Sequence, residues 1–337
     1  MNPSRILRPL IHQLALQRRA LKQAQKHTKP RKRKENRLPS KSTSVDVRDT
    51  TKIECPEILD FALDGERSAR FFSELDRALY GRAPRVIVDH RPLKSLSPSA
   101  ALVLIAHLYR AHRRRPDLGL FVQLPVATEA KDLLGMIGYY RYFKESIEWT
   151  SPTDSQRYYL EHRRGEQVIP EHAEALCSHL QLQGRLSSAK LYAALIEGMG
   201  NAIEWGYDKK ESGYRWWWLL GYRDAQTGEM AYSFYDQGVG IPVSIRVKLL
   251  DFLPFVRPSG SDLIETAVVE GRYSRTKQRG RGTGLPTLLD FVEEGSDGEL
   301  LIFSNESRCI FHHGKPVRKD DFSMGLRGTL ISWNFRP

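Results

Sequence analysis

The sequence has few cysteines and no long apolar run, and each absence excludes a class of protein. Its three cysteines, Cys55, Cys177 and Cys309, are far apart and form no Cys-x-x-Cys pair. This argues against a disulfide framework or a zinc site and suits a reducing cytoplasm, where we expect the protein to reside. No stretch of about 18 apolar residues is present, so we expect no membrane-spanning helix. The N-terminus is basic but has no long apolar centre, so it is a poor signal peptide.

Acidic residues are nearly missing from residues 1–41, which hold 13 Lys and Arg and a single acid, Glu35. This tail therefore carries the whole net charge of +12, while basic and acidic residues balance over 42–337. We expect a helix over Ile6–Lys26, followed by a disordered charge run. No Phe, Trp or Tyr lies between Lys26 and Lys41, so binding to nucleic acid or another polyanion would be non-specific. A solvated tail is the alternative.

Residues 42–150 alternate strand and helix signals, which predicts a small α/β sandwich. The expected strands are Thr51–Cys55, Arg85–His90 and Leu118–Leu124. The expected helices are Asp64–Tyr80, one running from about Ser97 or Ser99 to Arg113, and Thr128–Ile137.

This order of elements resembles the STAS-like domains of sulfate transporters and anti-anti-sigma factors. The resemblance also rests on a buried strand ending near Asp89 and on a serine-containing turn that opens the next helix. In the family's regulators this turn holds a phosphorylatable serine within an Asp-Ser-Ser-Gly-like sequence. Here it reads Ser-Leu-Ser-Pro-Ser over 95–99, so Ser97 and Ser99 can serve as phosphorylation sites or simply cap the helix.

A polar connector is expected over residues 151–169, followed by a helix over Pro170–Leu182. The histidines between the two domains are His162, His172 and His179. A histidine autokinase needs a phosphoacceptor histidine on a two-helix hairpin, and residues 151–186 are too short for two long helices.

The second half of the chain contains glycine-rich turns next to predicted strands and helices. A helix opening at Ser187 or Ser188 contains Glu197 and Asn201, and two strands follow over Tyr214–Arg223 and Glu229–Tyr235. The second strand ends in Asp-Gln-Gly-Val-Gly over 236–240, and Gly-Arg-Gly-Thr-Gly over 280–284 opens another helix through Phe291. The remaining expected strands are Glu299–Ser304, Cys309–His312 and Gly328–Phe335. Glycines ahead of a helix present backbone amides to phosphate.

These motifs, in this order and over residues 170–337, resemble the GHKL ATPases, which include gyrase, the large heat-shock chaperones, histidine kinases and mismatch-repair ATPases. The Asn-Ala-Ile-Glu-Trp-Gly-Tyr stretch over 201–207 is most similar to the anti-sigma serine-kinase branch. The resemblance implies a two-layer α/β sandwich of the Bergerat type that binds ATP and Mg²⁺.

The same resemblance assigns roles to individual residues. Asn201 would place its side-chain oxygen on Mg²⁺, and Glu197 would activate the attacking water. Asp236 would accept a hydrogen bond from the adenine amino group, which favours ATP over GTP. The remaining expected nucleotide-binding residues are Gly238, Gly240, Lys277, Gly280, Gly282, Gly284 and Thr329.

The sequence therefore predicts a regulatory Mg-ATP-binding protein that hydrolyses ATP and uses lid closure to switch partner contacts. A protein serine kinase acting on a STAS-like partner is the alternative, and a non-hydrolysing ATP-binding scaffold is a third reading. We expect a protein partner at the STAS-like domain, and the sequence leaves a homo-oligomer open.

Overall fold

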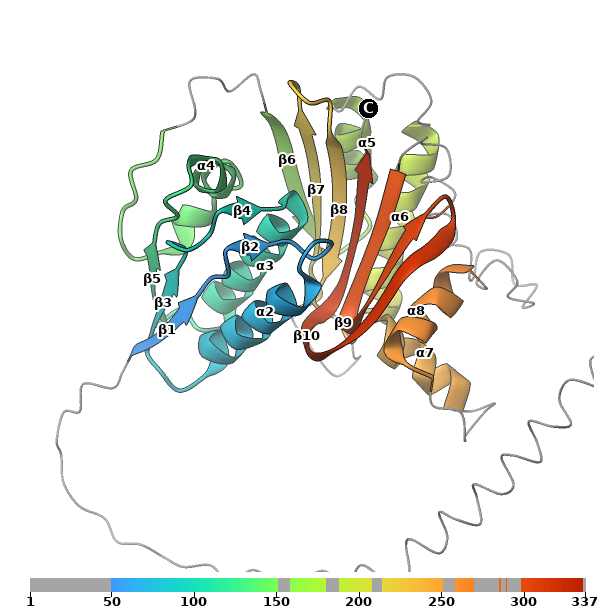
Figure 1. The fold of residues 1–337 in the computed structure, drawn as a ribbon, viewed down its shortest axis with the longest axis horizontal. Helices are drawn as coiled ribbons and strands as arrows, with labels where there is room; N and C mark the ends of the chain where they lie inside the picture. The colour runs from blue at the N-terminus through green and yellow to red at the C-terminus, as the bar shows by residue number, and fades with distance from the viewer. Residues whose placement is uncertain are drawn as a thin grey trace, which may run out of the picture. The chain divides into compact units, whose positions relative to one another are not determined.

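A computed structural model describes residues 50–150, 158–179, 188–207, 214–250, 258–269, 285, 289 and 298–335. All of these belong to one compact unit with mixed α/β structure (Figure 1). The basic tail of residues 1–41, with its expected helix, lies outside the described residues. No helix in the described ranges is both long and apolar enough to cross a membrane.

The first part of the unit is built on a parallel sheet of order β1-β3-β5, with a short second ladder between β2 and β4. The alternation of strands and helices predicted for residues 42–150 is confirmed. The strands are β1 (Thr50–Glu54), β2 (Ile58–Leu59), β3 (Arg85–Asp89), β4 (Ser95–Leu96) and β5 (Gly119–Gln123). The helices are α2 (Gly65–Tyr80), α3 (Pro98–Arg114), α4 (Thr128–Met136) and the 3₁₀ helix η2 (Tyr139–Tyr142).

Helix α3 begins at the serine-containing turn, and Ser97 is its N-cap. The Ser97 hydroxyl accepts a hydrogen bond from the Ala100 amide at 3.3 Å, and Pro98 occupies the first turn. Such a cap satisfies one of the amides that a helix start leaves without a partner. Ser99 is buried, and its hydroxyl lies 3.1 Å from that of Ser97. The capping role predicted for this turn is confirmed for Ser97.

The second part of the unit is built on an antiparallel sheet of order β6-β7-β8-β10-β9. Its strands are β6 (Tyr158–Gly165), β7 (Trp217–Asp224), β8 (Met230–Asp236), β9 (Gly298–His312) and β10 (Lys315–Phe335). Its helices are α5 (Pro170–His179), α6 (Ser188–Trp205), α7 (Ile241–Leu250) and α8 (Gly260–Val269).

Two sequence expectations about this sheet are corrected. Residues 158–165 were expected within a connector, but they form β6 and pair with all of β7, so the sheet begins before residue 170. The two strands expected over Glu299–Ser304 and Cys309–His312 are one strand, β9, because the intervening residues continue the ladder with β10 across register shifts.

Helices α2 and α3 are shared between the two sheets, whereas the sequence predicted two sandwiches in succession. Within the unit α3 packs on β7 and β8, α2 packs on β10, and one hydrophobic core includes residues of both parts. The reason lies in α3, where every residue from Ser99 to Leu108 is buried. A helix that is apolar on all sides needs cover on all sides. A second core lies on the opposite face of the antiparallel sheet, against α5, α6 and α8.

Arg308 on β9 ties the two parts together in the buried layer. Its guanidinium contacts Asp320 at 2.6 Å and donates to the carbonyl oxygens of Phe61 and Ala62 at 2.6 and 3.0 Å.

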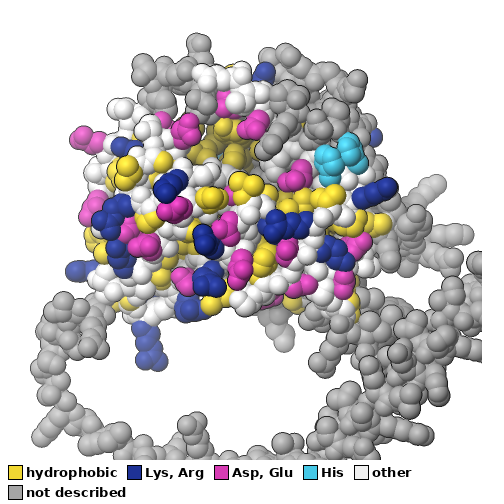
Figure 2. All heavy atoms as spheres, viewed as in Figure 1, with side chains coloured by type: hydrophobic (Ala, Val, Ile, Leu, Met, Phe, Trp, Pro, Cys, Tyr) yellow, Lys and Arg dark blue, Asp and Glu magenta, His cyan; other side chains and the backbone are white. Residues whose placement is uncertain are grey.

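On the molecular surface, Lys and Arg side chains are interspersed with Asp and Glu over the face in Figure 2, as the charge balance of residues 42–337 predicts.

Candidate functional site

Asp236 ends strand β8 in the middle of the antiparallel sheet. It is paired in register with Trp217 on β7 and with Thr329 on β10. The side chain is buried at 6% exposure, and its Oδ1 accepts a hydrogen bond from the Gly238 amide at 2.8 Å. This is the only hydrogen bond to the carboxylate within the described residues. The carboxylate can therefore accept a hydrogen bond from a further donor.

Burial also changes the protonation of this acid. Loss of solvent raises the pKa of Asp236 to about 7, and the hydrogen bond from Gly238 offsets only part of the rise. A carboxyl group with a pKa near neutrality and few donors gains most from a ligand that donates to it. Perturbed acids of this kind concentrate at functional sites.

Thr329 lies opposite Asp236 and is held by a serine that sequence reasoning did not single out. The Thr329 Oγ1 lies 2.9 Å from the Oγ of Ser304, its register partner on β9. Ser304 also donates to the Gly328 carbonyl oxygen at 3.1 Å and accepts from the Ile241 amide at 2.9 Å. Ser304 thereby joins β10 to the start of α7. Its signal in the sequence is only its place at the end of an apolar strand.

The glycines after Asp236 are required by close packing of the chain on itself. A Cβ at Gly238 would lie 1.8 Å from the Gly206 carbonyl oxygen, at the end of α6. Gly240 has a φ of +85°, and a Cβ there would lie 2.1 Å from the Asn305 side chain. The sequence analysis assigned both glycines to nucleotide binding. In the structure, neighbouring parts of the protein already account for both.

Helix α6 places Glu197 and Asn201 one turn apart on a face that is only half-buried. Burial and the nearby Glu204 raise the pKa of Glu197, and a hydrogen bond from Asn201 opposes the rise. On the same helix, a Cβ at Gly200 would meet no described atom within 4 Å, whereas one at Gly198 would lie 3.2 Å from the Phe234 ring. Gly198 thus packs on the sheet, and Gly200 does not.

The end of α6 is fixed to the turn that follows Asp236. The Val239 amide donates to the Gly206 carbonyl oxygen at 2.5 Å, and the Gly206 amide donates to the Asn201 carbonyl oxygen at 3.1 Å. These bonds connect the helix of Glu197 and Asn201 with the turn of Asp236. The structure therefore connects the motif of Glu197 and Asn201 with that of Asp236, and Asp236 is in turn the register partner of Thr329.

The glycine-rich lid falls outside the described residues, and with it Lys277, Gly280, Gly282 and Gly284. Of the helix expected after it, Leu285 and Leu289 are described. Both are helical, and they pack on the second core.

Gln237 is a further residue that the sequence did not indicate. Its backbone N–H donates to the Tyr207 hydroxyl, and its side-chain oxygen accepts from the Tyr214 hydroxyl, both at 3.1 Å. Its carbonyl oxygen accepts from Nε of Arg327 at 3.1 Å. The backbone that presents Asp236 is therefore held by side chains from three other segments.

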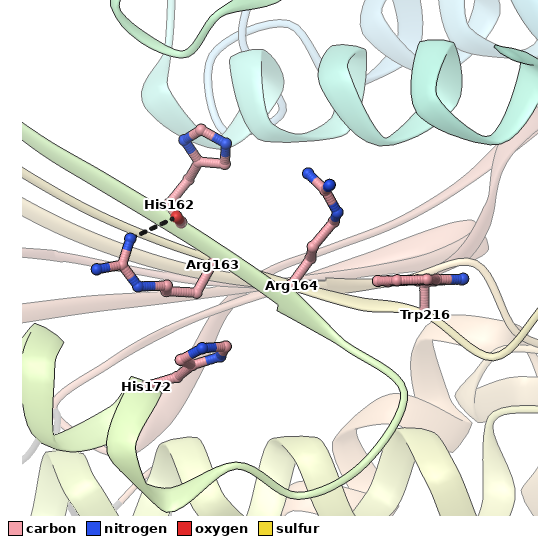
Figure 3. A pocket seen from close by; sticks show the side chains of 5 residues that line it. All are labelled: His162, Arg163, Arg164, His172 and Trp216. Atoms are coloured by element: carbon pink, nitrogen blue, oxygen red, sulfur yellow. Dashed lines mark hydrogen bonds between the residues drawn. The ribbon is translucent and has the colours of Figure 1, made fainter. Parts of the chain in front are cut away.

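A hollow of about 360 Å³ lies on β6 (Figure 3). Its lining comes from β6, from the start of α5 and from the residue before β7: His162, Arg163, Arg164, His172 and Trp216. None of the residues predicted to bind nucleotide lines it.

Comparison with known proteins adds no family to these observations. No protein-family model matches the sequence, and no curated protein is similar enough to count as a match.

Proposed function

We propose that the part of the chain built on the antiparallel sheet, from β6 to residue 337, forms an ATP-binding domain of the GHKL type, preceded by a STAS-like domain. The observation that carries this proposal is the buried Asp236 at the end of a central strand, joined to the end of α6 through Gly206 and Val239. Each residue type stands on the kind of element that the resemblance requires: an Asn on a helix, an Asp at a strand end and a Thr on the adjacent strand.

Asp236 would recognise adenine. Its carboxylate accepts one internal hydrogen bond, and the exocyclic amino group of adenine would supply another. Guanine has a carbonyl oxygen at the corresponding ring position, which would face the carboxylate without a proton between them. A site built in this way discriminates strongly, because the wrong base leaves a buried polar group unpaired.

Asn201 would hold Mg²⁺, and Glu197 would act on the water. Mg²⁺ bound there would neutralise charge on the phosphates, with phosphate and water oxygens completing its shell. Glu197 lies one turn earlier on the same face, where its carboxylate would take the proton of the attacking water. Its raised pKa brings this group closer to the range useful for a general base.

Transfer to water is favoured over transfer to Ser97 or Ser99 of this chain. The Ser97 hydroxyl is engaged as the N-cap of α3, and Ser99 is buried. Neither is presented for phosphorylation in this conformation. We therefore propose an ATPase whose lid closure switches protein contacts, with a serine kinase acting on a separate STAS-like partner as the alternative.

The test is incubation of the full chain with γ-labelled ATP and Mg²⁺, scoring free phosphate against labelled protein. The proposal predicts free phosphate and an unlabelled chain. Label on the chain, or on an added STAS-like protein, would favour the kinase alternative. Binding without either product would leave an ATP-binding scaffold, and no binding would remove the proposal.

A further inference from the structure

Strand β6 offers a sheet edge that no other described strand covers. It stands at the end of the strand order and pairs along its whole length with β7 on one side only. The outer side of such a strand presents amide and carbonyl groups that can pair with another chain. The hollow of about 360 Å³ lies at this strand.

Cationic side chains lie on both faces of β6. Leu160 packs against the first core, so His162 and Arg164 project from that same face. Arg163 projects from the other face, where His172 of α5 also lines the hollow. Figure 3 shows His162 and Arg164 on one side of the β6 ribbon and Arg163 and His172 on the other. Arg163 donates to the His162 carbonyl oxygen at 3.3 Å, so Arg164 is the cation of β6 on which the following argument rests.

The Arg164 guanidinium lies against three aromatic rings. Its guanidinium carbon lies 4.3 Å from the centre of the Tyr109 ring, 5.4 Å from that of Trp218 and 5.8 Å from that of Trp216. Within the described residues its N–H groups have no hydrogen bond or ion pair. Stacking fixes the plane of a guanidinium and leaves its edge able to donate two parallel bonds to a carboxylate.

We propose that the β6 edge binds an acidic peptide segment in extended conformation, which adds to the antiparallel sheet as a further strand. Main-chain hydrogen bonds to β6 would provide affinity, and side-chain contacts would provide specificity. Every second side chain of the added strand would lie on the Arg164 face, where an acidic side chain would accept from the guanidinium. This proposal does not depend on nucleotide binding.

The test measures binding of a fluorescein-labelled peptide, Thr-Glu-Glu-Val-Glu-Glu-Val-Thr, to the full chain at physiological salt. A second peptide has proline in place of the first valine, because proline cannot donate to a ladder. We expect the parent peptide to bind at least about ten-fold more tightly than the proline peptide. Arg164→Gln should weaken the parent by about ten-fold or more, the scale of a lost charged hydrogen bond. Arg67→Gln, at an exposed site on α2, is the matched control and should change nothing.

Hydrogen exchange locates the bound peptide and guards against a variant that folds poorly. Binding should protect amides of residues 158–165, and Arg164→Lys, which keeps the charge, should weaken the parent peptide less than Arg164→Gln. Equal affinity for the proline peptide would overturn the proposal, as would protection confined to the basic tail. So would an Arg164→Gln variant that folds and binds the parent peptide like the wild type.

Discussion

The Gly206 carbonyl oxygen accepts a hydrogen bond from the Val239 amide at 2.5 Å, which fixes the end of α6 to the turn after β8. The helix carries Glu197 and Asn201, and the turn begins with Asp236. Any side chain at Gly238 would break this contact, since its Cβ would lie 1.8 Å from the same carbonyl oxygen. A backbone hydrogen bond thus connects the helix of Glu197, proposed for water activation, with the turn of Asp236, proposed for base recognition.

Replacing Glu197 should separate ATP binding from turnover. Glu197→Ala should release phosphate about 10²–10⁴-fold more slowly, the range for a lost general base. Its affinity for Mg-ATP should stay close to that of the wild type, because Asn201 and Asp236 remain. Steady-state phosphate release and calorimetry check the two halves. Unchanged phosphate release would place water activation elsewhere.

Glu204 provides a finer control on the same helix. Its charge raises the pKa of Glu197, so Glu204→Gln should lower that pKa. The acidic limb of the rate profile should then move to lower pH, with little change in the plateau rate. A profile that does not move would argue that Glu197 does not control this limb.

ATP affinity should rise with pH around neutrality. Burial raises the pKa of Asp236 to about 7, and an amino donor favours the ionised form. Binding therefore requires loss of a proton below this pKa, and affinity should fall up to about ten-fold per pH unit there. Calorimetry across this range checks it, with Asp236→Asn subtracting titration of the nucleotide itself. A parallel pH dependence in the variant would contradict the acceptor role.

Arg308 should be a major source of stability for the layer shared by the two sheets. Arg308→Ala removes the buried donor to Asp320, leaving that carboxylate only the exposed Arg318, and leaves the Phe61 and Ala62 carbonyl oxygens without this donor, so unfolding free energy should fall by about 3 kcal/mol. Arg318→Ala is the control, since Arg318 contacts the same carboxylate but is 52% exposed, and it should cost under about 1 kcal/mol. Denaturant titration checks both variants. Equal losses would show that the buried contacts add nothing.

Sequence periodicity predicted most elements, because apolar spacing reports directly which face of a helix or strand is buried. It missed β6, whose Glu-His-Arg-Arg run over 161–164 has the polarity of a connector although it pairs with β7. It also missed that α3 lies between two sheets, although the apolar run over 100–106 covers every side of the helix.

The candidate site was predictable to the extent that residue types mark it. Asp236, Gly238 and Gly240 stood out as an acid and glycines at a strand end. Ser304 and Gln237 did not, because their roles come from contacts with residues far away in the chain.

The basic tail should account for any polyanion binding. Deleting residues 1–41 removes the whole net charge of +12, so binding to duplex DNA, single strands and heparin should be lost together. Binding by the full chain should weaken steeply with salt and ignore base sequence. ATP affinity should hardly change, since charges are screened over about 8 Å at physiological salt. Gel shifts at two salt concentrations check this, and a truncated chain that still shifts DNA would place the site in the folded unit.

The most direct test of the central claim is calorimetry of Mg-ATP binding to the wild type, to Asp236→Asn and to Asp224→Asn. Asp224 is a matched control, because it is also a buried acid at a strand end that accepts a turn amide, at 2.8 Å from Gln226. We predict that Asp236→Asn loses about 2–3 kcal/mol of binding free energy, as for a hydrogen bond to a charged group. Asp224→Asn should bind like the wild type. Equal affinity of Asp236→Asn and the wild type would contradict the assignment of the nucleotide site.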